Sequence, residues 1–147
     1  MSYIKVEIPG GGTGYENSPS VQIIGGGNSD KTIILKYASD LIKENEMRAF
    51  GEITFTGVLE YRWVTFEYEY YPYDEELEES EGFELIQIID SKWVENMASK
   101  SPFRNYPNRR FGPFIKESDV KHFRISFDDY GCFDIICLEV VIRQVLE

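Results

Sequence analysis

The sequence offers few residue combinations that could do chemistry. Histidine occurs once, at His122, and cysteine twice, at Cys132 and Cys137. A nucleophile, a base and an orienting acid could therefore be built around one imidazole only, with a cysteine or a serine as the nucleophile. His122 begins a predicted strand, where it would lie opposite Glu139 as a cross-strand polar pair. We therefore expect no catalytic residues and no cofactor, and we expect that the protein is not an enzyme.

The two cysteines also argue against a metal site. Cys132 and Cys137 lie on one predicted strand, at positions of opposite parity, so their side chains should point to opposite faces of the sheet. They should not pair with each other. A zinc site needs about four converging ligands, and the sequence contains a single histidine. We expect two buried thiols and no bound metal.

One segment comes close to a phosphate-binding motif. Residues 25–32, Gly-Gly-Gly-Asn-Ser-Asp-Lys-Thr, fit the pattern G-x-x-x-x-G-K-[ST] except at the second glycine, where Asp30 stands. A carboxylate there would repel phosphate, and the residues that follow favour a strand where the motif needs a helix N-terminus. The segment predicts a hairpin turn. Asp128 and Asp129 are likewise typical of a turn, and not of paired carboxylates in acid-base catalysis.

Composition narrows the possible partners. The chain has 147 residues, 42% of them hydrophobic, which fits one globular domain, 1–147. With 15 basic and 26 acidic residues the formal net charge is -11, which opposes binding to nucleic acid or to an anionic membrane surface. No apolar run approaches the ~20 residues of a membrane span, and the first residues do not resemble a secretion signal. We expect a cytoplasmic protein.

The hydrophobic pattern predicts a mostly β fold. Apolar residues alternate at 3–8, and strands are also predicted at 21–24 and 32–37 between glycine-rich turns. Residues 51–71 are rich in β-forming types, and Gly57 could mark a bulge. A short helix is predicted over 90–100, with Asp90 as its N-cap. Residues 38–48 fit either a short helix or an irregular connection. We expect an α+β domain with a largely antiparallel sheet of about six or seven strands, the short helix and a C-terminal β-hairpin.

The hairpin is predicted over residues 122–138. Apolar residues alternate on both sides of Asp-Asp-Tyr-Gly at 128–131, which supplies the turn. With Tyr130 and Gly131 as the tip, Ile125 would face Ile136 and Phe123 would face Leu138. A loop of odd length would place Arg124 among aliphatic side chains, because a slip of one residue turns every side chain to the other face.

An acidic run beside aromatic residues gives the main functional hint. Tyrosines often anchor protein interfaces, and carboxylates steer a basic partner. We expect a basic protein partner to bind this surface, and replacing its five glutamates with glutamine to weaken the binding. The surface consists of Tyr71, Tyr73, Glu75, Glu76, Glu78, Glu79 and Glu81.

Three segments resemble a group of small bacterial proteins, some of which are immunity proteins of polymorphic toxin systems. The segments are 61–67, 83–93 and 122–137. The resemblance implies an acidic, non-enzymatic protein that binds and blocks a toxin domain, for example a nuclease, in its own cytoplasm. It assigns no individual functional residue.

Two alternatives come from other classes of function. One is a small-molecule-binding module or enzyme with a pocket between sheet and helix, near Trp63, Trp93 and His122. A pocket with converging polar groups would favour it. The other is a subunit of a larger assembly, for which a large exposed apolar patch would speak. The sequence does not define the oligomeric state.

Overall fold

The computed structural model describes residues 2–13, 19–26, 29–44, 47–64, 84–100, 115–127 and 130–146. Over these residues the chain forms nine β-strands in two sheets and one short α-helix. Every strand pair is antiparallel. The predicted class, α+β with mostly antiparallel strands and a helix near residues 90–100, is confirmed. The number of strands exceeds the prediction of about six or seven, because the chain forms two sheets and not the one that was expected.

The five-stranded sheet has the order β1-β6-β7-β8-β5. Its strands are β1 (Ser2–Val6), β6 (Leu85–Ile89), β7 (Lys121–Phe127), β8 (Gly131–Cys137) and β5 (Glu60–Val64). The four-stranded sheet has the order β2-β3-β4-β9. Its strands are β2 (Ser20–Gly26), β3 (Ser29–Glu44), β4 (Met47–Thr56) and β9 (Glu139–Leu146). The helix α1 spans Lys92–Lys100, and two 3-10 turns, η1 and η3, span Pro9–Gly11 and Glu117–Asp119.

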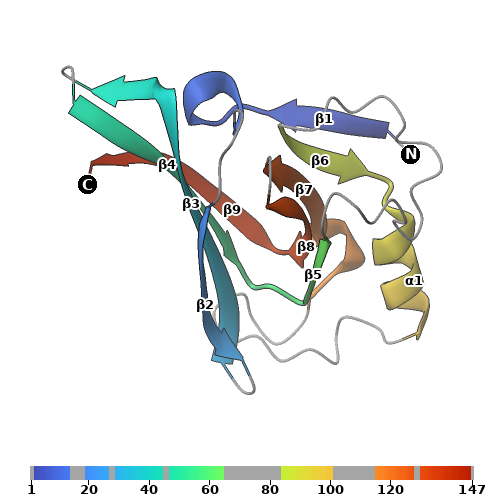
Figure 1. Ribbon diagram of the computed structural model, residues 1–147. Helices are drawn as coiled ribbons and strands as arrows, with labels where there is room; N and C mark the ends of the chain where they lie inside the picture. The colour runs from blue at the N-terminus through green and yellow to red at the C-terminus, as the bar shows by residue number, and fades with distance from the viewer. Residues whose placement is uncertain are drawn as a thin grey trace.

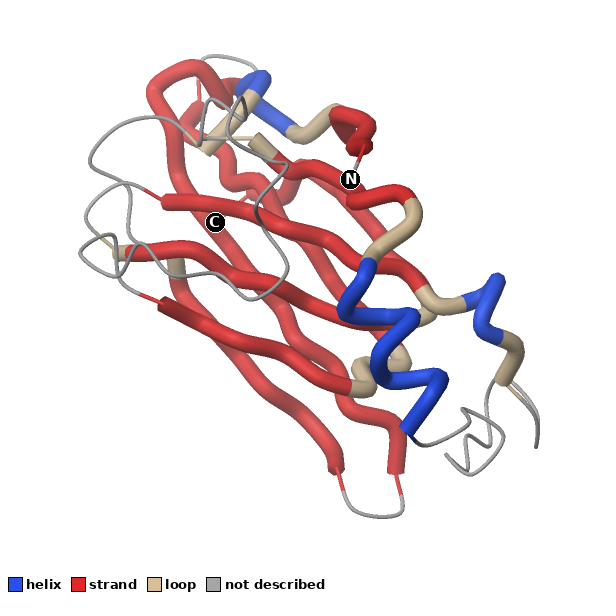
Figure 2. The backbone as a smooth tube through the Cα atoms, turned by 90° about the vertical axis from the view of Figure 1, so that its right-hand side faces the viewer, coloured by secondary structure: helices blue, strands red, loops and turns tan. Residues whose placement is uncertain are grey.

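The two sheets enclose the main core, and α1 covers the outer side of one of them (Figure 1). Ile33 and Phe55 from the four-stranded sheet pack in one cluster with Phe123 and Ile135 from the five-stranded sheet. A second cluster lies outside the five-stranded sheet, where Trp93, Val94 and Met97 of α1 pack with Ile136. Figure 2 shows α1 in front of one end of the strands. The sheet that carries α1 is therefore buried on both faces over part of its area.

Two strands pass from one sheet to the other at the same place. β4 leads into β5 through residues 57–59, and β8 leads into β9 through Leu138. The amide of Leu138 donates to the carbonyl of Thr56 (3.2 Å), and the amide of Leu59 donates to that of Ile136 (2.8 Å). Gly57 has φ 61°, a left-handed conformation that glycine adopts without strain. The bulge expected at Gly57 is thus a bend that moves the chain between sheets.

The register predicted for the β7-β8 hairpin is wrong. Arg124 lies opposite Asp134, and Phe123 lies opposite Ile135. The strands are joined across positions 128–130, so the loop has the odd length that the sequence argument rejected. That argument assumed that Arg124 would meet aliphatic side chains, whereas a carboxylate stands directly across from it. In this register His122 lies opposite Ile136, so it does not pair with Glu139.

Residues 38–44 and 47–48 belong to strands, and not to a short helix or an irregular connection. β3 continues to Glu44 and β4 begins at Met47, with a register shift between Ala38 and Lys43. Ile42 and Ala49 are fully buried between the sheets. Pairing with a neighbouring strand and burial of these side chains outweigh the weak local preference for a helix.

Gly51 provides a test of this core. A Cβ atom at this position would overlap the ring of Tyr37, whose hydroxyl donates to the carbonyl of Pro9 (2.6 Å). We expect Gly51→Ala to lower the free energy of unfolding by about 1–3 kcal/mol, measured by urea denaturation. The loss should be smaller in a Tyr37→Leu background, because the overlap is then relieved. Equal losses in the two backgrounds would contradict the contact.

Candidate functional site

The predicted partner-binding surface lies outside the described residues. Its two tyrosines and five glutamates, Tyr71, Tyr73, Glu75, Glu76, Glu78, Glu79 and Glu81, all fall between residues 65 and 83. The surface stays a prediction from the sequence. The candidate site that the described residues do form is elsewhere, on the outer side of the five-stranded sheet.

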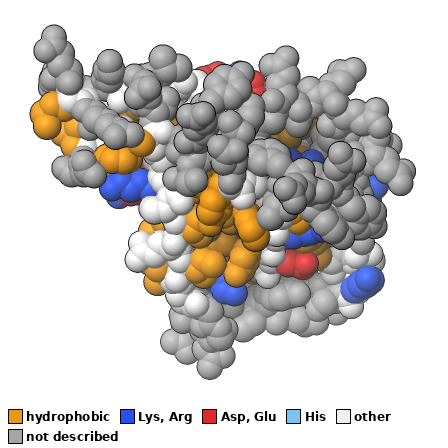
Figure 3. All heavy atoms as spheres, viewed as in Figure 1, with side chains coloured by type: hydrophobic (Ala, Val, Ile, Leu, Met, Phe, Trp, Pro, Cys, Tyr) orange, Lys and Arg blue, Asp and Glu red, His pale blue; other side chains and the backbone are white. Residues whose placement is uncertain are grey.

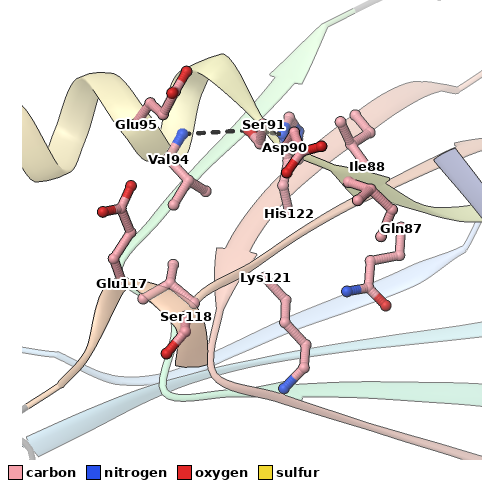
Figure 4. A pocket seen from close by; sticks show the side chains of 12 residues that line it. Gln87, Ile88, Asp90, Ser91, Val94, Glu95, Glu117, Ser118, Lys121 and His122 are labelled. Atoms are coloured by element: carbon pink, nitrogen blue, oxygen red, sulfur yellow. Dashed lines mark hydrogen bonds between the residues drawn. The ribbon is translucent and has the colours of Figure 1, made fainter. Parts of the chain in front are cut away.

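This site is a pocket of about 520 Å³ between the start of α1, η3 and the sheet. Glu95 and Glu117 lie on one side of it, and Asp90 and Gln87 on the other (Figure 4). Ser91 and His122 belong to its lining. The remaining lining residues are Ile88, Ile89, Val94, Ser118, Val120 and Lys121.

A chain of hydrogen bonds runs from the pocket into the sheet. Ser91 Oγ lies 2.8 Å from His122 Nδ1, and His122 Nε2 lies 2.7 Å from Asp134 Oδ1. Arg124 Nε donates to the same carboxylate oxygen at 2.9 Å. All four residues are buried, with Asp134 only 1% exposed. Serine, imidazole and carboxylate are therefore aligned in the order of an acyl-transfer triad, with the two ring nitrogens of the histidine exchanged.

The charges in this chain balance. Burial alone raises the pKa of Asp134, but the hydrogen bond from His122 and the charge of Arg124 outweigh it and hold the pKa below the ordinary 3.8. Asp134 is thus a carboxylate that accepts a hydrogen bond from His122 Nε2. When that ring nitrogen alone carries a proton, Nδ1 accepts a hydrogen bond from the hydroxyl of Ser91, an assignment that follows from the hydrogen-bonding pattern.

The fold holds each member of this chain in place. Arg124 and Asp134 are opposite residues of β7 and β8, and His122 lies two positions along β7 on the same face. The ring of Trp93, from α1, meets the imidazole edge to face with centroids 5.5 Å apart. The imidazole is therefore fixed by contacts from the helix as well as from the sheet.

Ser91 joins β6 to α1. Its Oγ accepts the amide proton of Val94 (3.2 Å), which makes Ser91 the N-cap of the helix. The sequence predicted Asp90 as the N-cap, and this is wrong by one residue. Asp90 has φ 54°, and this left-handed turn directs the chain from the strand into the helix.

The mouth of the pocket is acidic. Asp90, Glu95 and Glu117 are exposed around it. Lys121, also in the lining, donates from Nζ to the carbonyl of Leu138 (3.0 Å). In the described part of the chain, no group of three or more histidine, cysteine, aspartate or glutamate side chains could hold a metal ion.

The sequence identified only part of this site. It associated a pocket with Trp63, Trp93 and His122, and the structure brings the last two together. Trp63 lies elsewhere, with its indole nitrogen donating to the carbonyl of Tyr130 (3.2 Å). Ser91, Arg124 and Asp134 were not singled out as site residues. The available signal was the odd hairpin register, which places Arg124 opposite Asp134.

The other candidate motifs have structural roles. Lys31 and Thr32 of the phosphate-loop match lie on β3, and Gly26 pairs with Ser29 in the β2-β3 hairpin. This is the predicted hairpin. Lys31 and Thr32 lie on a strand, so they do not begin a helix whose N-terminus could bind phosphate. Cys132 and Cys137 are buried, unpaired with each other, and on opposite faces of β8.

An exposed apolar area bears on the assembly hypothesis. Figure 3 shows apolar side chains gathered between the strands that Figure 1 labels β2 and β5. Exposed apolar residues on these strands include Ile23, Tyr61 and Trp63, and the ammonium group of Lys31 lies over the Tyr61 ring. No described segment is seated on this area, so membership of a larger assembly stays a hypothesis.

Comparison with known proteins adds no relative to these observations. Scans of protein-family models, of curated proteins and of solved structures each gave no match. None of the helices in the described residues is long and apolar enough to cross a membrane. Function must therefore be argued from the chain itself.

Asp134 provides a test of the buried chain. We expect Asp134→Asn to lower the free energy of unfolding at neutral pH by about 3–5 kcal/mol, because Arg124 keeps its charge in a buried place and loses the carboxylate charge opposite it. Urea denaturation measures this loss. The exposed variant Asp90→Asn is the matched control and should change stability by less than about 0.5 kcal/mol. Similar losses in both variants would contradict the role of Asp134.

The same variant should change the pH dependence of stability. The folded protein holds the pKa of Asp134 below 3.8, so the ionised carboxylate favours folding above that pH. This contribution is lost as the pH falls through the folded-state pKa. Between about pH 5 and pH 2 the stability of Asp134→Asn should therefore fall less than that of the native protein. Parallel curves would show that Asp134 titrates normally.

Proposed function

We propose that this protein binds a basic protein partner and blocks it, in the manner of an immunity protein that inhibits a toxin domain such as a nuclease. The observation that carries the proposal is the excess of carboxylates. The formal net charge is -11, and three exposed carboxylates, Asp90, Glu95 and Glu117, surround the pocket beside α1. Such a surface attracts cationic partners and repels nucleic acid.

Two acidic surfaces could serve this function. The sequence predicts one at residues 71–81, which contains tyrosines that could act as anchors. The pocket mouth is the second, and its recess could admit a lysine or arginine side chain. Exposed ion pairs contribute little individually, up to about 1 kcal/mol each. Charge would therefore set the rate and salt dependence of binding, while buried anchors would supply most of its strength.

A small-molecule ligand is the second candidate. It is favoured by the pocket of about 520 Å³, which falls within the size range of ligand sites. Ser91 and His122 supply the convergent polar groups that such a site requires. This candidate needs no protein partner.

Capture from a lysate of the source cells identifies the partner of the first proposal. The native protein is used as bait at low and at moderate salt, and a recovered basic protein is purified for binding measurements. Replacing Glu75, Glu76, Glu78, Glu79 and Glu81 with glutamine should weaken its binding and flatten the salt dependence. Loss of five steering charges should act mainly on the association rate.

A second variant separates the two acidic surfaces. The pocket-mouth variant carries Asp90→Asn, Glu95→Gln and Glu117→Gln, and a control carries Glu7→Gln and Glu60→Gln at exposed sites away from the pocket. Weaker binding by either acidic variant, with the control unchanged, assigns the partner surface. Equal affinity and equal salt dependence in all the variants would overturn the proposal.

A further inference from the structure

Independently of the partner-binding proposal, we infer that Ser91 is a nucleophile and that His122 is its base. Ser91 takes the acyl group of a small ester that carries a positive charge. The inference stands on geometry. Ser91 and His122 line the same pocket, their reacting atoms are 2.8 Å apart, and Asp134 holds the far nitrogen of the imidazole at 2.7 Å. It would make the protein an enzyme, contrary to the expectation from its sequence.

Helix capping alone does not account for this arrangement. An N-cap needs only an oxygen that accepts an amide proton, which Ser91 provides to Val94. Capping requires neither an imidazole on the hydroxyl nor a buried carboxylate behind the imidazole. Arg124 already supplies the countercharge to the buried Asp134 without His122. The additional hydrogen bonds direct a basic nitrogen at the hydroxyl of Ser91.

The reaction balances with the groups present. Ser91 Oγ attacks the ester carbonyl carbon while its proton passes to His122 Nδ1. The bond from the acyl carbon to the alcohol oxygen breaks, and the proton on His122 passes to that oxygen. Water then attacks the acyl-serine with His122 again as the base, which releases the acid and restores Ser91. Asp134 is a positioning residue that keeps the imidazole oriented.

The start of α1 can stabilise the charge that develops on the carbonyl oxygen. The first amides of a helix lack partners within the helix, and the helix dipole is positive at that end. Ser91 caps this end, and the amide of Trp93 belongs to the first turn. An oxyanion formed at Ser91 would therefore lie beside backbone donors, as catalysis of acyl transfer requires.

The mouth of the pocket indicates the class of ester. Asp90, Glu95 and Glu117 are exposed around it, so a cationic group is preferred to a neutral or anionic one. The contribution of exposed carboxylates is limited to about two- to fivefold in rate. A lysine ester and the ester of norleucine, which has the same four-carbon side chain without the ammonium group, form a pair of probes.

A fluorophosphonate tests the nucleophile directly. Attack by Ser91 Oγ on phosphorus expels fluoride and leaves a stable adduct, which peptide mass spectrometry can locate. We expect the adduct on Ser91 in the folded protein and its loss when urea unfolds the chain. The absence of an adduct, or an adduct only on other residues, would overturn the inference. The hydrogen bonds of Ser91 and His122 would then serve only to hold α1 against the sheet. This experiment uses the native protein, so its result does not depend on whether a variant folds.

Ester hydrolysis tests the substrate class. The 4-nitrophenyl esters of Nα-acetyl-lysine and Nα-acetyl-norleucine are compared on the native protein and on Ser91→Asn, which keeps an N-cap oxygen. The native protein should hydrolyse the lysine ester about two- to fivefold faster than the norleucine ester, and the variant should fall to the uncatalysed rate. Equal rates for the two esters would overturn the cationic class, and an active variant would overturn the role of Ser91.

Discussion

The buried carboxylate of Asp134 determines the arrangement of the outer face of the five-stranded sheet. A charge that is 1% exposed is tolerated only with a countercharge and hydrogen-bond donors around it. Arg124 supplies the countercharge from the opposite position on β7, which ties the register of the hairpin to an ion pair. His122 supplies the second donor, and its other nitrogen meets Ser91, the N-cap of α1. One buried charge thus connects strand register, imidazole orientation and the start of the helix. Few substitutions in this chain of contacts could act on one member alone.

The bend between the sheets explains why this face is available to α1. β8 and β9 are one continuous run of chain that changes sheet at Leu138, next to the place where β4 gives way to β5. Before the bend, β8 turns Ile135 inward to the main core and Ile136 outward to α1. After the bend, β9 adds Val140 and Ile142 to the opposite wall of the core. The second sheet covers the inner face, so the helix can pack only on the outer one. The pocket forms where α1 and η3 leave part of that outer face uncovered.

The sequence predicted the kinds of elements well because local patterns determine them. Apolar patterning predicted several of the strands, and the helix predicted over 90–100 exists as α1, whose buried residues are Trp93, Val94 and Met97. The division into two sheets and the hairpin register were not predicted, because both depend on which strands meet. Asp90 and Ser91 are both good N-cap types, and only the hydrogen bond from the Val94 amide to Ser91 Oγ shows that Ser91 is the cap. Arg124 and Asp134 were missed for a related reason. Each alone appears unsuited to a buried strand, and the pair is favourable only once the register is known.

The pocket combines two electrostatic environments that act at different ranges. Its mouth carries exposed carboxylates, whose attraction for a cation is long-ranged, weak and reduced by salt. Its floor is buried, and there Arg124 pairs with Asp134, so the floor offers an imidazole and a hydroxyl. A ligand held by charge alone would therefore stay at the mouth and exchange rapidly. A ligand that remains bound must also satisfy the floor, through apolar contact with Ile88, Val94 and Val120 or through reaction at Ser91. Because a protein partner would engage mainly the mouth and an ester the floor, salt should weaken the first kind of binding far more than it slows the second.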